Sequence, residues 1–173
     1  MDNLVTRVVA ERLAAAGGAV LRFNFRGVGR SEGAHDGGRG EIDDLDAAGR
    51  LLAARHPQLP VWFAGYSFGA VVMLHAARDG RCASADPLIA LAPPITHYSF
   101  DFLSELPNPV ALVCGGEDTL TPGDELRRQT ATWKNLLGAE LLAGAGHDLG
   151  THAGDTGPLE AAVDRSIRAL CRP

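Results

Sequence analysis

The chain has 173 residues, 46% of them hydrophobic, and a formal net charge of −5 at pH 7. A chain of this length can bury its own core, so we expect one domain over residues 1–173 that needs no disulfide support. The basic residues are spread along the sequence and form no basic patch, so we expect neither nucleic acid nor a membrane as a partner.

The cysteines and the N-terminal residues indicate the cellular compartment. Cys82, Cys114 and Cys171 lie far apart, with neither metal-ligand spacing nor the density of a disulfide framework, so we expect reduced, structural thiols. Residues 1–16 contain charged side chains where a signal peptide would be continuously apolar, and no later stretch could span a bilayer. The sequence therefore predicts a cytoplasmic protein.

The first half of the chain alternates between helical patterns and one β-rich run. Residues 4–17 (LVTRVVAERLAAAG) have apolar residues at helical spacing, with Asp2 or Asn3 as the expected N-cap and glycines at the end. Residues 19–25 (AVLRFNF) are predicted to form a strand. A glycine-rich segment follows, and then a helix over 41–56 with acidic residues in its first turns, where they suit the helix dipole.

The second half continues this alternation and sets the fold class. We expect strands at 60–66, 87–94, 109–118 and, more weakly, 139–147, and helices at 68–78, 123–137 and 157–171. Continuously apolar strands alternating with helices are typical of a parallel sheet that is buried on both faces. The predicted class is α/β, a mostly parallel sheet with helices on both faces. In such sheets ligands bind beyond the carboxyl ends of the strands.

The segment GYSFG (65–69) lies where a predicted strand gives way to a predicted helix. At a sharp turn of this kind Ser67 would be strained, and Gly65 and Gly69 would lack side chains so that strand and helix can approach. The turn would lift the hydroxyl out of the core and direct the first helix amides toward it, where they can stabilise an oxyanion. A helix N-cap serine is the alternative, but the flanking strand and helix favour a nucleophile.

A serine nucleophile needs a base and an orienting acid later in the chain. Asp118 follows an apolar strand in the turn CGGEDTLTP, where an ordinary turn aspartate is the alternative. His147 lies in a loop of small residues after the last strand, where a solvated loop histidine is the alternative. His152 is a second candidate for the base. Asp124 is a second candidate for the acid, although its place at a helix start favours a cap.

The other four histidines fit a catalytic role less well and are predicted to be surface or packing residues. They are His35, His56, His75 and His97. The segment 95–108 is too short for a large lid domain, so we expect an open site that suits small or protruding esters. The aromatic residues Tyr98, Phe100 and Phe102 either flank that site or serve in packing.

Four motifs in this order, LRFNFRGVGRSEG, FAGYSFGA, CGGEDTLTP and AGAGH, resemble the α/β-hydrolase superfamily, in particular the small, lidless, dienelactone hydrolase-like bacterial hydrolases. The resemblance runs from Met1 to the end of the chain. It implies a hydrolase that cleaves a small-molecule ester or related acyl bond through an acyl-enzyme, without metal or organic cofactor. The implied roles are nucleophile for Ser67, general base for His147, orienting acid for Asp118, and half of the oxyanion hole for the Phe68 amide.

The chain departs from this family at its N-terminus. In relatives, a strand and a loop with a His-Gly or His-Pro signature precede the first helix seen here, and that loop gives the second oxyanion amide. The strand would lie between 19–25 and 60–66, so we expect an N-terminally incomplete fold with a gap in its sheet. Unpaired backbone groups in such a gap are costly. If the fold is complete as it stands, we expect the strands at 19–25 and 60–66 to pair directly or to borrow a strand from another copy, and catalysis to be impaired.

Three rival interpretations remain. Glycines within 27–33 resemble a dinucleotide-binding loop, but the next helical pattern begins only near Glu41, too late to meet a pyrophosphate. The acidic residues of 43–46 could bind a metal ion, yet no calcium-loop pattern completes them and a helix start explains them. A non-catalytic member of the hydrolase fold, acting as a binding or scaffold protein, is the strongest rival, since fold does not guarantee function.

Overall fold

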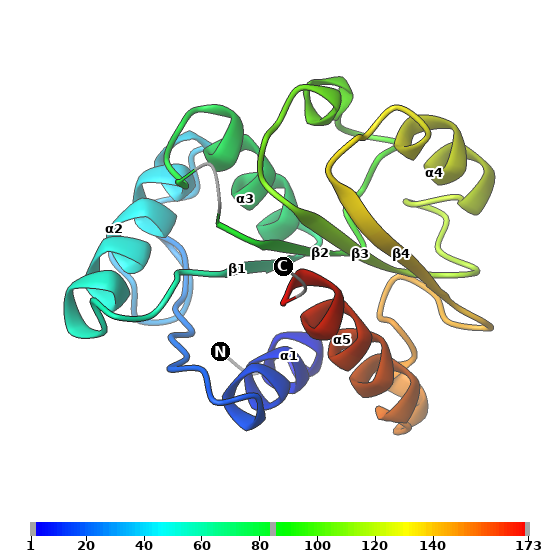
Figure 1. Ribbon diagram of the computed structural model, residues 1–173, viewed down its shortest axis with the longest axis horizontal. Coiled ribbons are helices and arrows are strands. Elements are labelled where there is room, and N and C mark those ends of the chain that lie inside the picture. The colour runs from blue at the N-terminus through cyan, green and yellow to red at the C-terminus, as the bar shows by residue number, and fades with distance from the viewer. Residues whose placement is uncertain (1–2, 84–85, 172–173) are drawn as a thin grey trace.

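The centre of the fold is a parallel sheet of four strands in the order β1-β2-β3-β4 (Figure 1). The structure is a computed structural model that describes residues 3–83 and 86–171, so Asp2, one of the two expected N-caps, lies outside it. All three strand pairings are parallel. The strands are β1 (Phe63–Tyr66), β2 (Leu88–Leu91), β3 (Val110–Gly115) and β4 (Leu136–Leu142).

Helices cover both faces of the sheet, which confirms the predicted α/β class (Figure 1). α1 (Leu4–Ala15) and α5 (Gly157–Leu170) pack together on one face, while α2 (Arg39–Arg55), α3 (Phe68–Arg78) and α4 (Gly123–Thr130) lie on the other. Alternate residues of β2 enter two separate cores, Leu88 on the α3 side and Ile89 on the α5 side. Within the described ranges, no helix combines the length and apolar character needed to cross a membrane.

The predicted helices and the last four strands are present, with β1, β2 and β3 shorter than predicted, and the largest shift lies between α4 and β4. The Asn3 side chain accepts a hydrogen bond of 3.1 Å from the Thr6 amide and caps α1. The helix predicted over 123–137 ends at Thr130, and β4 begins at Leu136 instead of residue 139. The reason is tertiary: Leu136 pairs with Val110 in the β3–β4 ladder, and this pairing overrides the helical pattern.

The prediction of a strand at 19–25 is wrong, because this segment joins no β-ladder in the described structure. A groove of about 600 Å³ lies between it and β1, so no neighbouring strand is within pairing distance. The groove walls are largely apolar and include Phe23, Phe25, Trp62 and Ala64. The expected gap in the sheet is therefore confirmed, and β1 is an edge strand.

His75 of α3 packs beneath the short 3-10 helix η1 (Asp101–Ser104). Its ring lies 6.1 Å from that of Phe100 and 5.2 Å from that of Phe102, centroid to centroid. Phe100 is fully buried, so these two aromatic residues serve in packing. The buried Nε2 of His75 has no hydrogen-bond partner among the described residues. Burial lowers the pKa of His75, with a further contribution from the positive charge of Arg78.

This lowered pKa predicts acid sensitivity. Below the ordinary histidine value of 6.5, the unfolded chain binds more protons at His75 than the folded chain, so the free energy of unfolding should fall as the pH is lowered through that value. His75→Leu removes the titrating group and keeps an apolar side chain in the packing. Urea unfolding at about pH 7.5 and about pH 5.5 should therefore show a smaller loss of stability in the variant than in the parent protein. The same loss in both proteins would contradict the prediction.

Candidate active site

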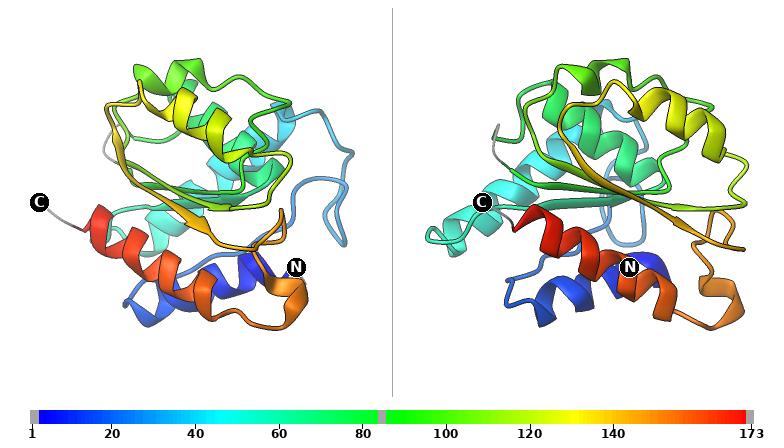
Figure 2. Two further views of the ribbon diagram at one scale, coloured as in Figure 1. Left: turned by 90° about the vertical axis from the view of Figure 1, so that its right-hand side faces the viewer. Right: turned by 45° about the vertical axis from the view of Figure 1, so that its right-hand side comes forward.

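The candidate site lies at the carboxyl ends of the strands. Ser67 directly follows β1, Asp118 lies in the turn after β3, and His147 lies in the loop after β4. In the left view of Figure 2, the segment that follows β4 and the loop that precedes α2 extend beyond the same edge of the sheet. The structure brings together the three residues that the sequence analysis selects.

Ser67 occupies the turn between β1 and α3 with φ 53° and ψ −119°. A positive φ is unusual for a residue with a Cβ atom and persists only where surrounding contacts enforce it. Its amide donates a 2.9 Å hydrogen bond to the Leu91 carbonyl, which extends the β1–β2 pairing to the serine itself. Ser67 is the N-cap residue of α3, but its hydroxyl makes no cap bond to the helix and instead lies 2.8 Å from Nε2 of His147.

The two glycines of the turn have different roles. A Cβ atom on Gly65 would lie 2.4 Å from the carbonyl oxygen of Gly69 and 2.7 Å from the amide nitrogen of Ala70, so β1 and α3 can approach only at a glycine. A Cβ atom on Gly69 would meet no other heavy atom within 4 Å. The expectation of close approach therefore holds for Gly65 and is wrong for Gly69, which contributes its backbone and not the lack of a side chain.

Asp118 and His147 form the rest of a connected chain of hydrogen bonds. The Asp118 side chain is fully buried; one oxygen accepts a 2.8 Å bond from the Leu120 amide, and the other lies 2.8 Å from Nδ1 of His147. An ionised carboxylate only accepts, so Nδ1 carries the proton and Nε2 of the neutral imidazole is left to accept from the Ser67 hydroxyl. This is the arrangement that makes a serine nucleophilic.

Backbone contacts hold the Asp118 turn against the His147 loop. The Gly116 amide donates to Leu142 at 2.8 Å, and the Glu117 amide donates to Ala145 at 2.9 Å. A Cβ atom on Gly115 would lie 2.1 Å from the Gly146 carbonyl oxygen, so only glycine permits this approach. The acid and the imidazole are thus positioned by the same pair of segments.

The alternate acid and base are bonded elsewhere in the described structure. His152 is exposed and pairs through Nδ1 with Asp148 at 2.9 Å. Asp124 is exposed in the first turn of α4, where it pairs with Arg127. Both candidates therefore act in local surface contacts.

The sequence analysis missed Tyr66, the residue before the serine. Its hydroxyl donates a 3.1 Å hydrogen bond to the backbone carbonyl of His147, and its ring lies 5.5 Å from the imidazole, centroid to centroid. Burial raises the pKa of this phenol, as do the negative charges of Asp148 and Asp118. Its position beside Ser67 was the one signal available in the sequence.

The acidic residues of 43–46 pair with arginines. Asp44 accepts from Nη2 of Arg26 at 2.8 Å, and Arg81 pairs with both Asp43 and Asp46. In the part of the chain that the structure describes, no three or more His, Cys, Asp or Glu side chains are grouped as a metal ion would need.

The glycine-rich loop does not match a dinucleotide-binding site. α2 begins at Arg39, well after the glycines of 27–33. The helix N-terminus that would meet a pyrophosphate is therefore separated from those glycines by further loop.

The two glycines of the turn give a matched pair of test substitutions. Gly65→Ala should lower the free energy of unfolding by about 1–3 kcal/mol, because the new methyl overlaps the backbone of α3. Gly69→Ala places its methyl in open space near the start of α3 and should leave stability unchanged or raise it by up to about 1 kcal/mol. Urea unfolding of both variants measures the difference. Equal destabilisation by the two substitutions would contradict this account of the turn.

Comparisons with known proteins agree with this geometry. Residues 4–113 match the family model described as "Serine aminopeptidase, S33". An uncharacterized protein of Rickettsia prowazekii (strain Madrid E) is 33% identical over 131 residues, which cover 73% of this chain and 54% of that protein. The chain thus spans about half the length of this curated relative.

Two solved structures are similar over nearly the whole chain. An alpha-beta serine hydrolase homologue from Coxiella burnetii has a TM-score of 0.85 and 32% identity, covering 96% of this chain and 77% of that one. An a/b serine hydrolase without lid from Xanthomonas campestris has a TM-score of 0.85 and 30% identity, covering 100% of this chain and 77% of that one. With the family match over most of its length, the chain belongs to the S33 family of α/β serine hydrolases.

Proposed function

We propose that this chain is a cytoplasmic serine hydrolase that cleaves a carboxylic ester, or a related acyl bond, of a small molecule through an acyl-enzyme. The observation that carries the proposal is the position of His147, whose two ring nitrogens lie 2.8 Å from the Ser67 hydroxyl and 2.8 Å from the buried carboxylate of Asp118. Membership of a serine hydrolase family supports the same assignment.

In the proposed mechanism, Oγ of Ser67 attacks the carbonyl carbon of the substrate while Nε2 of His147 takes the hydroxyl proton. Asp118 stays ionised and stabilises the imidazolium that forms. The tetrahedral intermediate collapses as His147 returns the proton to the leaving alcohol, and the acyl group remains on Ser67. Water, activated by His147, then attacks this ester and releases the acid and the free serine.

The Phe68 amide is the proposed donor to the oxyanion. α3 begins at Phe68, and the first amides of a helix have no partner within the helix and carry its positive dipole end. Removing one of two such donors typically slows an enzyme by about a hundredfold to a thousandfold, so a second donor beside Phe68 would matter for the rate. The groove along β1 borders Phe68 and leaves room for such a donor at this edge.

We further propose that the substrate is small or protrudes from the site. The segment between β2 and β3 contains only the short helix η1, and Phe100 and Leu103 within it are buried in the core. Part of this segment is therefore committed to packing, and it contains no helical domain of the size of a lid. The similar Xanthomonas hydrolase is described as lacking a lid, which supports an open site here.

The proposal predicts loss of activity at three positions, with a matched control for the histidine and another for the aspartate. Ser67→Ala should abolish hydrolysis of 4-nitrophenyl acetate and labelling by a fluorophosphonate probe, because both need the hydroxyl. His147→Gln and Asp118→Asn should lower kcat by about a thousandfold or more. The controls His152→Gln and Asp124→Asn remove surface contacts and should keep the parent rate.

Labelling also separates the enzyme from the non-catalytic alternative. A binding or scaffold protein with this fold would remain unlabelled at Ser67 although folded, as judged by circular dichroism. That result, or unchanged turnover in Ser67→Ala, would reject the hydrolase proposal.

A further inference from the structure

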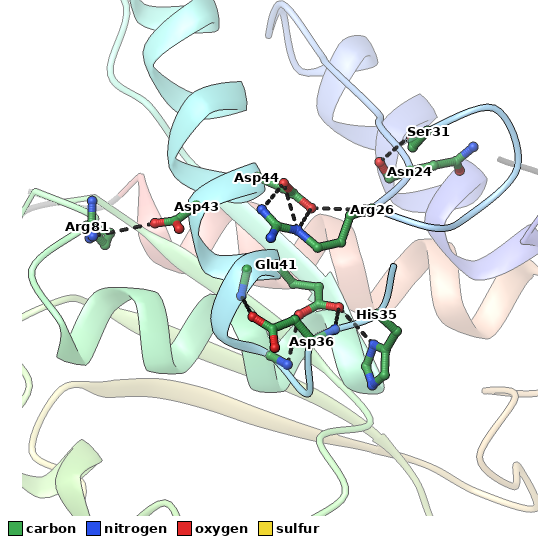
Figure 3. Close-up of polar contacts among 11 residues, drawn as sticks. Asn24, Arg26, Ser31, His35, Asp36, Glu41, Asp43, Asp44 and Arg81 are labelled. Atoms are coloured by element: carbon green, nitrogen blue, oxygen red, sulfur yellow. Dashed lines mark hydrogen bonds and ion pairs between the residues drawn. The ribbon is translucent and has the colours of Figure 1, made fainter. Parts of the chain in front are cut away.

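A second histidine–carboxylate pair joins His35, in the loop before α2, to Glu41 in the first turn of α2 (Figure 3). Nδ1 of His35 lies 2.8 Å from Oε1 of Glu41. The Glu41 side chain is completely buried at the start of α2 and also accepts hydrogen bonds from the amides of Asp36 at 2.9 Å and Gly38 at 2.8 Å. The carboxylate is thus built into the fold, and His35 is its side-chain partner.

The charge state of Glu41 fixes the tautomer of His35. Burial on its own would raise the pKa of Glu41, but the backbone amides that point at the carboxylate outweigh it, and the pKa lies below its ordinary value. An ionised carboxylate has no proton to donate, so the proton between the two groups belongs to Nδ1 of His35. In the neutral ring, Nε2 is then a hydrogen-bond acceptor.

Further polar contacts tie the first part of the loop that carries His35 to α2 and to itself (Figure 3). Arg26 binds Asp44 of α2 through both its backbone amide and its guanidinium group. The Ser31 hydroxyl donates to the Asn24 carbonyl at 3.0 Å. Positioning of this kind lets an exposed side chain bind a ligand with little loss of conformational entropy.

The His35 ring contacts the ring of Phe68, the residue that follows Ser67 in the chain. The two rings meet edge to face, with centroids 5.1 Å apart. The His35 side chain is 65% exposed, so it is accessible to a ligand. The sequence analysis predicts His35 to be a surface or packing residue, and its bond to a buried carboxylate indicates a more specific role.

We propose that His35 is a substrate-binding residue, and that its Nε2 accepts a hydrogen bond from a hydroxyl group of the substrate. This inference rests on the proposed hydrolase function and narrows its substrate class to hydroxylated esters, with the hydroxyl on either the acyl or the alcohol side. Glu41 is a positioning residue in this scheme, since it acts only through the tautomer and orientation of His35.

Paired esters that differ by their hydroxyl groups test the proposal. One pair is 4-nitrophenyl 3-hydroxybutyrate and 4-nitrophenyl butyrate; the other is 2,3-dihydroxypropyl butyrate and propyl butyrate. The parent enzyme should prefer the hydroxylated member of at least one pair by about 3- to 10-fold in kcat/KM, the range expected for one hydrogen bond.

His35→Phe keeps a ring against Phe68 and removes the acceptor, so the preference should vanish through a higher KM for the hydroxylated ester. Turnover of the plain ester and labelling of Ser67 should stay at the parent level. His35→Gln supplies an amide oxygen and should restore part of the preference. The matched control His56→Phe changes an exposed histidine at the end of α2 and should leave the preference intact.

Two results would overturn these conclusions, and they can be told apart. If Ser67 is labelled and plain esters are hydrolysed, but the parent enzyme shows no preference in either pair or His35→Phe leaves it unchanged, the role of His35 is wrong and the hydrolase proposal stands. If the folded parent protein neither labels at Ser67 nor hydrolyses any of the esters, the hydrolase proposal itself fails.

Discussion

The site depends on the close approach of β1 to the first turn of α3. Because Gly65 has no side chain, the backbone of α3 can cross directly over the end of the strand, and Ser67 is forced into a positive φ between them. A strained residue of this kind has few alternative conformations, so its hydroxyl is presented at a fixed point. Neighbouring contacts offset the backbone strain: the Ser67 amide donates a hydrogen bond to the carbonyl of Leu91 in β2, and α3 buries one face against the core.

A second constraint connects Asp118 and His147, the other two residues of the proposed triad, independently of the serine. The turn after β3 and the loop after β4 share backbone hydrogen bonds and a close glycine contact, which position Asp118 and His147 relative to each other. Tyr66 then joins the His147 loop to the strand that carries Ser67. Electrostatic catalysis relies on groups that are oriented before the substrate binds, and these contacts supply that orientation.

Local patterns were sufficient for the parts of this fold that depend on neighbouring residues. The helix that begins at Phe68 and the chain order of Ser67, Asp118 and His147 could be read from strand, turn and helix signals alone. The sequence patterns gave wrong predictions where strand pairing determines the structure. Residues 19–25 have a strand composition but pair with no strand in the described structure. Leu136 lies in a helical pattern but pairs with Val110 of β3. Tyr66 and His35 were missed because their partners, the His147 carbonyl and Glu41, come into contact only through the fold.

The edge position of β1 has a mechanical consequence for Ser67, the proposed nucleophile. In a sheet interior, a strand is clamped by ladders on both sides, whereas β1 is held by the β2 ladder alone and faces the groove with its other side. Ser67 therefore follows a strand that is hydrogen-bonded to a neighbouring strand along one edge only. The β2 ladder, the packing of α3 and the hydrogen bond from Tyr66 to the His147 loop hold this strand end, and a strand added along the groove would support it from the opposite side.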